Sequence, residues 1–395
     1  MIQVFKPSMT QEEVDAVADV LRSGWIGLGP KTAEFEQRFA EFVGAAFAVA
    51  VNSCTAALDL ALKLLDVSHG HEVIVPTMTF VSTAHCVAYR QAMPVFADVD
   101  PQTLSIDLND VRCKITNRTR AIIPVHYSGR PIDMDALKEV AGGIPIIEDC
   151  AHAAGARYKG RSVGSIGDIG CFSFHAVKNL AMGDGGALTL NNQQWMERCK
   201  RLRWLGIDKG TWDRTATDNS YWWQYFVDEI GLKCHMNDIA AAIGLVQLRR
   251  LRAMNARRRE IARQYTEAFA RYDFIETPPA DDSVCESSWH IYCIKTPQRD
   301  ELSMYLQSRG IATGVHYAPI HLYKCYGNQP HLPRAEEIFA RIISLPMYPD
   351  MTDADIQQVI DSITDYYVQH GFVASRKAMA KLPRQVPGRQ NRSAA

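Results

Sequence analysis

The sequence of 395 residues has little of what marks membrane, secreted or zinc-binding proteins. Hydrophobic residues make up 47% of the chain, but no apolar run is long enough to cross a bilayer. Residues 1–4 lead directly into polar sequence, without the basic start and apolar core of a secretory signal. None of the ten cysteines forms a Cys-x-x-Cys pair, so we expect no metal site. Scattered cysteines in apolar segments suit a reducing environment, which predicts a cytoplasmic protein.

The chain also lacks an excess of charge of either sign, because 43 Lys and Arg residues face 44 Asp and Glu residues. The net charge of −1 creates no global field, so we expect no nucleic acid and no membrane as partners. The exception is the tail 371–395, which has basic residues and no acids. We predict that this tail is disordered and solvated; binding to nucleic acid or lipid is the alternative.

Strand-like and helix-like segments alternate through the first half of the chain. This alternation predicts an α/β fold with a mostly parallel sheet that is covered on both faces. The expected strands are 47–51, 72–75, 93–97, 120–125, 145–149, 169–174 and 187–190, and the expected helices are 10–22, 31–43, 55–65, 81–90, 134–140 and 193–205.

The second half predicts a smaller α/β domain that follows a long helix at 237–272. Its expected elements are strand 290–295, helix 299–309, strand 312–316 and helix 353–367. We therefore divide the chain into a large cofactor-binding domain with an N-terminal arm (1–250), a small C-terminal domain (251–370) and the tail (371–395). An aromatic-rich insert at 210–227 is expected either to shape the substrate pocket or to pack against a second subunit.

Lys178 stands in an unusual place, between the apolar segments 169–174 and 187–190 and beside the glycine-rich turn 183–186. Burying a charged amine is costly unless it is paired, neutralised or used in a covalent bond. We interpret Lys178 as the residue that holds pyridoxal 5′-phosphate (PLP) as a Schiff base.

Two acids, Glu148 and Asp149, end the predicted strand 145–149. Ligands of open α/β sheets bind at the carboxyl ends of strands, and PLP needs a carboxylate against its pyridine nitrogen. Because side chains alternate across a strand, only one of the two acids can face the ligand. An acid at a strand end can also be an ordinary helix cap.

The turn from strand to helix at 52–57 is a candidate phosphate site. The N–H groups of a helix start, together with the hydroxyl of Ser53 or Thr55, would hold the phosphate, although a plain helix cap fits equally well. The segment 164–170 is rich in glycine but lacks the GxGxxG spacing and a following helix, so we expect no dinucleotide there.

Aromatic and imidazole side chains supply the remaining candidates. Phe80 could stack on a pyridine ring or simply pack in the core. His316 and Tyr317 precede Pro319 and His321, and no cysteines or acids lie nearby to complete a metal site. We expect this segment to be a loop that faces the substrate.

Taken together, seven segments resemble the DegT/DnrJ/EryC1/StrS family of PLP-dependent sugar aminotransferases, and they occur in the family's order. The segments are GWIGLGPKTAEFE, VNSCTAALDLAL, EVIVPTMTFVSTA, AIIPVHYSGRPIDMDAL, IIEDCAHAAGARYKGRSVGSIGD, FSFHAVKN and GVHYAPIH. FSFHAVKN and PVHYSG look most like the branch that aminates a UDP-4-keto-pentose to 4-amino-4-deoxy-arabinose. The resemblance implies the aspartate-aminotransferase fold (PLP fold type I) and a homodimer with shared active sites.

The resemblance also implies roles for individual residues. Lys178 would be the Schiff-base lysine and Asp149 the acid at the pyridine nitrogen, and both would be catalytic. The other implied cofactor contacts are Cys54, Thr55, Phe80, His152, Ser173 and His235, the last reaching the phosphate of the neighbouring subunit, and the implied substrate contacts are Trp25, His316 and Tyr317.

The implied activity moves an amino group from glutamate to a keto-sugar, in particular a nucleotide-linked 4-keto sugar for cell-surface polysaccharide or related glycoconjugates. The free Lys178 amine would move the α-proton as general base and acid. Lys178 favours amination, because relatives that deoxygenate carry histidine at this position. The alternatives are a 3-keto-sugar or cyclitol aminotransferase and a non-catalytic regulator that binds PLP or sugar.

Overall fold

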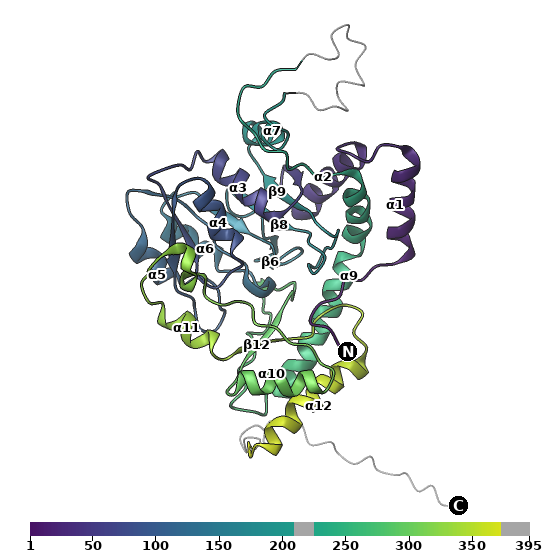
Figure 1. Cartoon of the computed structure of the whole chain (residues 1–395), viewed down its shortest axis with the longest axis vertical. Coiled ribbons are helices and arrows are strands. Elements are labelled where there is room, and N and C mark those ends of the chain that lie inside the picture. Colours follow the sequence, from purple (N-terminus) through teal and green to yellow (C-terminus); the bar gives the residue numbers. More distant parts are fainter. Residues whose placement is uncertain (209–224, 373–395) are drawn as a thin grey trace, which may run out of the picture.

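The computed structural model describes residues 1–208 and 225–372. A large part built around a sheet lies in the upper half of Figure 1, and a smaller part lies below it. Helix α9 (Asp238–Phe269) packs against helices α1 and α2 of the large part and α12 of the small part. Most of the predicted insert at 210–227 and nearly all of the predicted basic tail lie outside the described residues.

The central sheet has the strand order β1-β9-β8-β5-β4-β2-β3. Its two ladders, β1-β9-β8-β5 and β3-β2-β4, are joined by parallel bridges between Ile122 and Ile146 and between Val125 and Asp149. Strand β9 runs antiparallel to both of its neighbours, whereas the other pairs are parallel. The strands are β1 (Phe47–Val51), β2 (Glu72–Pro76), β3 (Met93–Ala97), β4 (Thr119–Ile122), β5 (Ile147–Asp149), β8 (Ile169–Ser173) and β9 (Gly186–Leu190).

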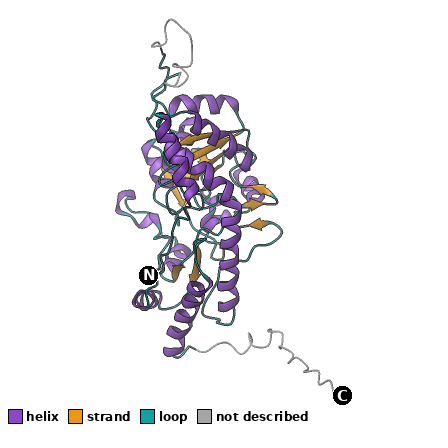
Figure 2. Cartoon of the chain, turned by 90° about the vertical axis from the view of Figure 1, so that its right-hand side faces the viewer, coloured by secondary structure: helices purple, strands orange, loops and turns teal. Residues whose placement is uncertain are grey.

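Helices cover both faces of this sheet (Figure 2), because its strands carry apolar side chains on both sides. In β1, Ala48 and Ala50 join one core, whereas Val49 and Val51 join another. The first core also contains residues of α2 (Pro30–Val43) and α9, and the second contains residues of α3 (Cys54–Leu64), α4 (Ser82–Tyr89) and α7 (Gln193–Leu202). The predicted α/β fold is confirmed.

Helix α9 also contributes to the core of the small part. Leu251 and Met254 pack in the core of the large part, whereas Ile261 and Tyr265 belong to the core of the small part. The division of the chain at residue 250 stays a prediction. The other elements are α1 (Gln11–Ser23), α5 (Leu108–Lys114), α6 (Met134–Ala141), α10 (Arg299–Ser308), α11 (Pro333–Phe339), α12 (Asp353–Gln369), β6 (Arg157–Tyr158), β7 (Arg161–Ser162), β10 (Cys285–Glu286), β11 (Tyr292–Lys295) and β12 (Ile342–Leu345).

The predicted strand at 312–316 is wrong. Strand β11 pairs with β12, which the sequence pattern did not reveal, and among the described residues the segment 312–316 makes one isolated bridge, from Gly314 to Ser344. The chain cannot extend this pairing because it turns toward the large part, where the Tyr127 hydroxyl donates a hydrogen bond to the carbonyl of His316.

The described residues 1–208 and 225–372 contain no helix that is both long and apolar enough to span a bilayer. All ten cysteines lie in this part of the chain as free thiols, and all but Cys113 and Cys325 are buried. Buried thiols of this kind serve as small apolar side chains.

A buried carboxylate joins α9 to the start of α2. Asp238 accepts hydrogen bonds from the backbone N–H groups of Gly29, Lys31 and Thr32 at 2.9–3.0 Å and from the Thr32 hydroxyl at 2.7 Å. The first N–H groups of a helix have no partner within the helix, so Asp238 satisfies donors that would otherwise be buried unpaired. This contact fixes the position of α9 against the large part.

We therefore predict that Asp238→Asn lowers the free energy of unfolding by about 2 kcal/mol, because an amide N–H₂ replaces an acceptor that faces backbone donors. Urea unfolding followed by tryptophan fluorescence measures the change. Asp19→Asn is the matched control, because Asp19 is exposed and forms an ion pair with the equally exposed Arg22 on α1. Its effect should stay within about 0.5 kcal/mol. Equal effects of the two substitutions would contradict the assigned role of Asp238.

Candidate active site

A cavity of about 350 Å³ opens among the elements that carry the predicted site residues. Its walls come from the ends of β5 and β8, the loop between β8 and β9, the start of α3 and the loop after residue 313. The structure brings nine of the predicted residues together in the lining: Cys54, Thr55, Phe80, Asp149, His152, Ser173, Lys178, His316 and Tyr317.

Lys178 lies in the loop between β8 and β9, where its backbone N–H donates to the carbonyl of His175 at 2.8 Å. Burial lowers the pKa of its amine to about 8, and the charge of Asp149 opposes this shift. A free lysine has a pKa near 10.4, so the site makes the neutral, nucleophilic amine accessible near neutral pH. This is the property that covalent catalysis by a lysine requires.

The close approach of two backbone segments places the loop of Lys178 beside α3. A Cβ atom on Gly186 would lie 2.4 Å from the carbonyl carbon of Ser53 and 2.6 Å from the nitrogen of Cys54. Only glycine therefore fits at the start of β9. The Ser53 hydroxyl caps α3 by accepting from the N–H of Ala56, and both Ser53 and Thr55 line the cavity.

Asp149 is the acid that faces the cavity. One of its carboxylate oxygens accepts a hydrogen bond from the Thr83 hydroxyl at 2.9 Å, and the other accepts from the N–H of Ala151 at 3.0 Å. Burial raises the pKa of Asp149, although these hydrogen bonds and the charge of Lys178 act in the opposite direction. A desolvated carboxylate held in this way is well suited to accept from a cationic N–H of a bound ligand.

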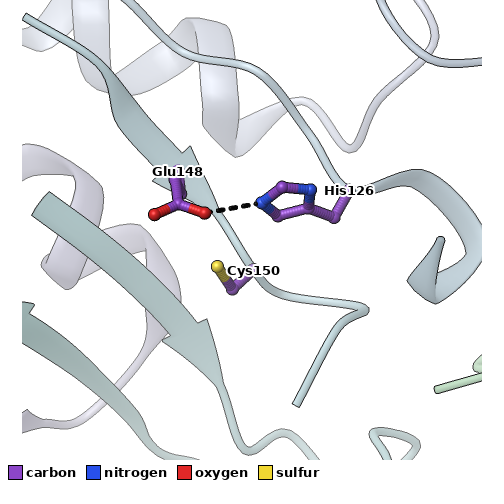
Figure 3. Close-up of side chains that lie close together, drawn as sticks. All are labelled: His126, Glu148 and Cys150. Atoms are coloured by element: carbon purple, nitrogen blue, oxygen red, sulfur yellow. Dashed lines mark hydrogen bonds and ion pairs between the residues drawn. The ribbon is translucent and has the colours of Figure 1, made fainter. Parts of the chain in front are cut away.

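Glu148 has a different role, on the opposite side of the strand. It accepts hydrogen bonds from the N–H groups of Gly164, Ile166 and Gly167 at 2.6–2.9 Å. It also lies 3.0 Å from His126 Nε2, a contact marked by the dashed line in Figure 3. Burial alone would raise the pKa of Glu148, but the hydrogen bonds prevail and lower it. The glycine-rich segment that lacks a dinucleotide fingerprint thus binds a carboxylate of the chain itself.

His126, Glu148 and Cys150 form a buried trio whose potential metal-ligand atoms lie within 4.8 Å of one another (Figure 3). The N–H of Ile132 donates to His126 Nδ1 at 3.2 Å, so the ring proton lies on Nε2 and points to Glu148. Both ring nitrogens are therefore engaged within the protein. We assign the trio a structural role in supporting the strand that ends at Asp149.

His152 and Phe80, two of the predicted cofactor contacts, are not ordinary core residues in the structure. His152 is buried with Nε2 3.0 Å from the Tyr317 hydroxyl, and its Nδ1 has no hydrogen-bond partner among the described residues. Burial lowers the pKa of His152 well below its ordinary value, so it is a neutral imidazole. Phe80 is 57% exposed, which excludes the core role and leaves its ring available to a ligand in the cavity.

These observations together test whether PLP fits. The cavity offers a lysine amine, a carboxylate, an exposed aromatic ring and an orphaned imidazole nitrogen. The first turn of α3, whose N–H groups lack partners within the helix, and the Ser173 side chain offer donors for a phosphate. The residues present fit the cofactor.

Trp25 and His235 do not line the cavity of their own chain. The Trp25 indole N–H donates to the carbonyl of Leu28 at 3.0 Å. His235 packs edge-on against Trp204, with ring centroids 4.5 Å apart, and its Nδ1 lies 2.9 Å from the carbonyl oxygen of Met236. The contacts expected of these two residues stay predictions.

The structure adds lining residues that the sequence did not reveal, notably Phe5 and His290. The N-terminal arm reaches the cavity because Ile2 bridges to Ile311 and the N–H of Met347 donates to the carbonyl of Val4. No local pattern around Phe5 signals this placement. His290 was expected only as the first residue of a strand, yet its Nε2 lies 3.5 Å from Lys178 Nζ.

Comparisons with known proteins agree with the fold and the site. The family model described as "DegT/DnrJ/EryC1/StrS aminotransferase family" matches residues 7–364. The spore coat polysaccharide biosynthesis protein SpsC of Bacillus subtilis is 42% identical over 373 residues, which cover 91% of this chain and 95% of SpsC.

Two solved structures have a TM-score of 0.88 to this chain. The aminotransferase TlmJ from Streptoalloteichus hindustanus is 37% identical, and the match covers 94% of this chain and all of TlmJ. Spr1654 from Streptococcus pneumoniae, solved in its PMP form, is 33% identical, and the match covers 93% of this chain and all of that one.

The fold is therefore PLP fold type I, with the sheet and the cavity of an aminotransferase. The chain belongs to the DegT/DnrJ/EryC1/StrS aminotransferase family.

The carboxylates of the neighbours Glu148 and Asp149 should affect the free energy of unfolding in opposite directions, and substitution of each can test this. The pKa of Glu148 is lower in the folded state than in the unfolded state, where it is about 4.3. The ionised carboxylate therefore stabilises the fold above the unfolded pKa. This stabilisation is lost as the pH falls through the folded-state pKa. We predict that Glu148→Gln lowers the free energy of unfolding at pH 7 by about 3 kcal/mol, and by less in acid.

Asp149→Asn is the matched comparison, because it removes a carboxylate whose burial is unfavourable. The Thr83 hydroxyl, which also contacts Thr79, can rotate to accept from the new amide. Unfolding of the cofactor-free variant should therefore require at least as much urea as the wild type. A large loss of stability in Asp149→Asn, or none in Glu148→Gln, would contradict these assignments.

Proposed function

We propose that this protein is a PLP-dependent aminotransferase that moves the amino group of glutamate to a nucleotide-linked 4-keto sugar. The observation that supports this most strongly is a single cavity holding a desolvated lysine, Lys178, and a desolvated carboxylate, Asp149. Among the relatives, Spr1654 is solved in PLP and PMP forms and SpsC is described as a polysaccharide biosynthesis protein.

The residues of the cavity would divide the work of holding the cofactor. Lys178 would bind it covalently, Asp149 would accept from the ring N–H, and Phe80 would lie against the ring. Cys54 and Thr55 at the start of α3, with Ser173, would bind the phosphate. When bound, the cofactor supplies an electron sink and carries the amino group between donor and acceptor.

The protein would supply proton transfer and orientation. Lys178, with a pKa of about 8, can both take and return a proton at Nζ near neutral pH. The neutral His152 would present its unpartnered Nδ1 to the ligand while its Nε2 stays with Tyr317. Burial lowers the pKa of His316 to about 4, so this imidazole also adds no charge to the cavity. With Tyr317, it would contact the sugar.

The subunit arrangement is part of the proposal. Trp25 and His235, which lie away from their own chain's cavity, would complete the site of a second copy, Trp25 at the sugar and His235 at the phosphate. A homodimer with two shared sites would follow from this exchange.

We expect the purified protein with PLP to convert glutamate to 2-oxoglutarate in the presence of a nucleotide-linked 4-keto sugar, read by mass spectrometry of the amino-sugar. A panel with UDP-4-keto-pentose, a 3-keto nucleotide sugar and a keto-cyclitol distinguishes the acceptors. Lys178→Ala should lower turnover by at least ~10³-fold, because it removes the covalent and proton-transfer group. Lys159→Ala, at an exposed lysine paired with Asp135, should change nothing. Turnover by Lys178→Ala near the wild-type rate would overturn the proposal.

Mixed dimers test the shared site. Lys178→Ala chains and His235→Ala chains should each form inactive homodimers. Co-expression should restore about a quarter of the wild-type activity, because half of randomly mixed dimers then contain one intact site of two. Failure of mixing to restore activity would show that His235 acts within its own chain, and full activity of His235→Ala alone would remove it from the site.

A further inference from the structure

The side chain of His290 contacts the Lys178 amine, and none of the roles described above explains it. Its Nε2 lies 3.5 Å from Lys178 Nζ, at the outer limit of a hydrogen bond. His290 is buried, lies two residues before the start of β11 and lines the same cavity. Whether it attracts or repels the lysine depends on which of its ring nitrogens carries the proton.

Two buried asparagines determine the position of that proton. Asn255 of α9 donates from Nδ2 to the carbonyl of Ala154 at 2.9 Å, which directs its Oδ1 toward Asn179. Asn179 in turn donates from Nδ2 to Asn255 Oδ1 at 2.9 Å and to the carbonyl of Ser288 at 2.7 Å. Both amide protons of Asn179 are therefore used, and its orientation is fixed.

The oxygen of Asn179 must then face His290. The distance from Asn179 Oδ1 to His290 Nδ1 is 3.1 Å, and a carbonyl oxygen can only accept, so Nδ1 carries the ring proton. In a neutral imidazole this leaves a lone pair on Nε2, which is the atom that faces Lys178.

Contacts with two other rings hold the His290 imidazole in its orientation. Phe5 of the N-terminal arm stacks on His290 with ring centroids 5.2 Å apart and an interplanar angle of 10°. The ring of His152 packs against the same imidazole at a tilt of 38°, with ring centroids 4.7 Å apart. Such packing removes water and rotamer freedom from the group beside the amine.

We propose that Asn255 and Asn179 fix the tautomer of His290, and that His290 Nε2 accepts a hydrogen bond from the Lys178 ammonium whenever this amine is not bound to the cofactor. His290 is then a positioning residue for Lys178. The consequence for turnover rests on the proposed function, whereas the tautomer and the contact do not.

The charges around this pair are consistent with that role. Burial lowers the pKa of His290 well below its ordinary value, and the positive charge of Lys178 adds to this effect, so the imidazole stays neutral. An imidazolium here would repel Lys178, whereas a neutral acceptor stabilises its charged form. The titratable groups facing the pair are Asp149 and Cys54 for Lys178, and His152, Arg258 and His316 for His290.

The decisive measurement is the pKa of Lys178 in the cofactor-free full-length protein. The pH dependence of acetylation by acetic anhydride, located to Lys178 by peptide mass spectrometry, gives this value. We expect His290→Leu to lower the pKa of Lys178 by about one unit, because the acceptor for the ammonium is lost. His290→Gln can keep an oxygen near the amine and should retain most of the wild-type value.

The direction of this shift separates the two possible roles. If His290 only packed against the lysine, leucine would fill nearly the same space and the pKa of Lys178 would stay near its wild-type value. An unchanged or raised pKa in His290→Leu therefore overturns the proposal. Lys159 serves as an internal control, because it lies on the surface beside Asp135 and its acetylation profile should not change.

A second measurement tests the tautomer without any substitution in the asparagines. In wild-type protein labelled with ¹⁵N-histidine, the His290 signals, identified by their absence in His290→Gln, should show a protonated Nδ1 and an unprotonated Nε2 at pH 7.5. A proton on Nε2 would contradict the proposal. Both measurements use protein without cofactor, so they remain decisive even if the sugar aminotransferase assay fails.

Discussion

The structure depends on keeping one amine and one carboxylate away from water inside the same cavity. Lys178 loses part of its proton affinity through burial, and Asp149 gains proton affinity for the same reason. Neither arrangement favours folding by itself, because each places a charge-bearing group in a poorly solvated site. The contacts of Thr83, Ala151 and, in our proposal, His290 hold these groups in place. Two desolvated titratable groups in one cavity are typical of a site whose ligand interacts with both of them.

The general fold could be predicted from the sequence because strands and helices alternate with clear periodicity over most of the large part. Strands such as β1 and β2 were located closely, since both of their faces are buried and their apolar runs are continuous. The small part was less predictable. The segment 312–316 has strand-like composition. Its backbone contacts are with Ile2, whose carbonyl accepts from the N–H of Ala312, and with Ser344, and both residues are distant in the sequence.

The residues of the candidate site also differ in how far the sequence could predict them. Lys178 and Asp149 each lie in a continuous motif, so the sequence alone was enough to select both as candidates, and the structure places both in one cavity. Phe5 and His290 could not be found, because their positions result from the N-terminal arm crossing the small part and from an amide network that begins on α9. Local patterns do not encode contacts between residues more than 100 positions apart, such as Asn179 and His290.

In the function proposed here, Lys178 forms the covalent bond to the cofactor and Asp149 accepts a hydrogen bond from the ring N–H. Incubation of the protein with PLP, reduction with borohydride and peptide mass spectrometry test it most directly. We expect a pyridoxyl group on Lys178 and on no other lysine, with a large loss of this labelling at low PLP concentration in Asp149→Asn. A pyridoxyl group on a different lysine, or none on Lys178, would show that the proposed role of Lys178 is wrong.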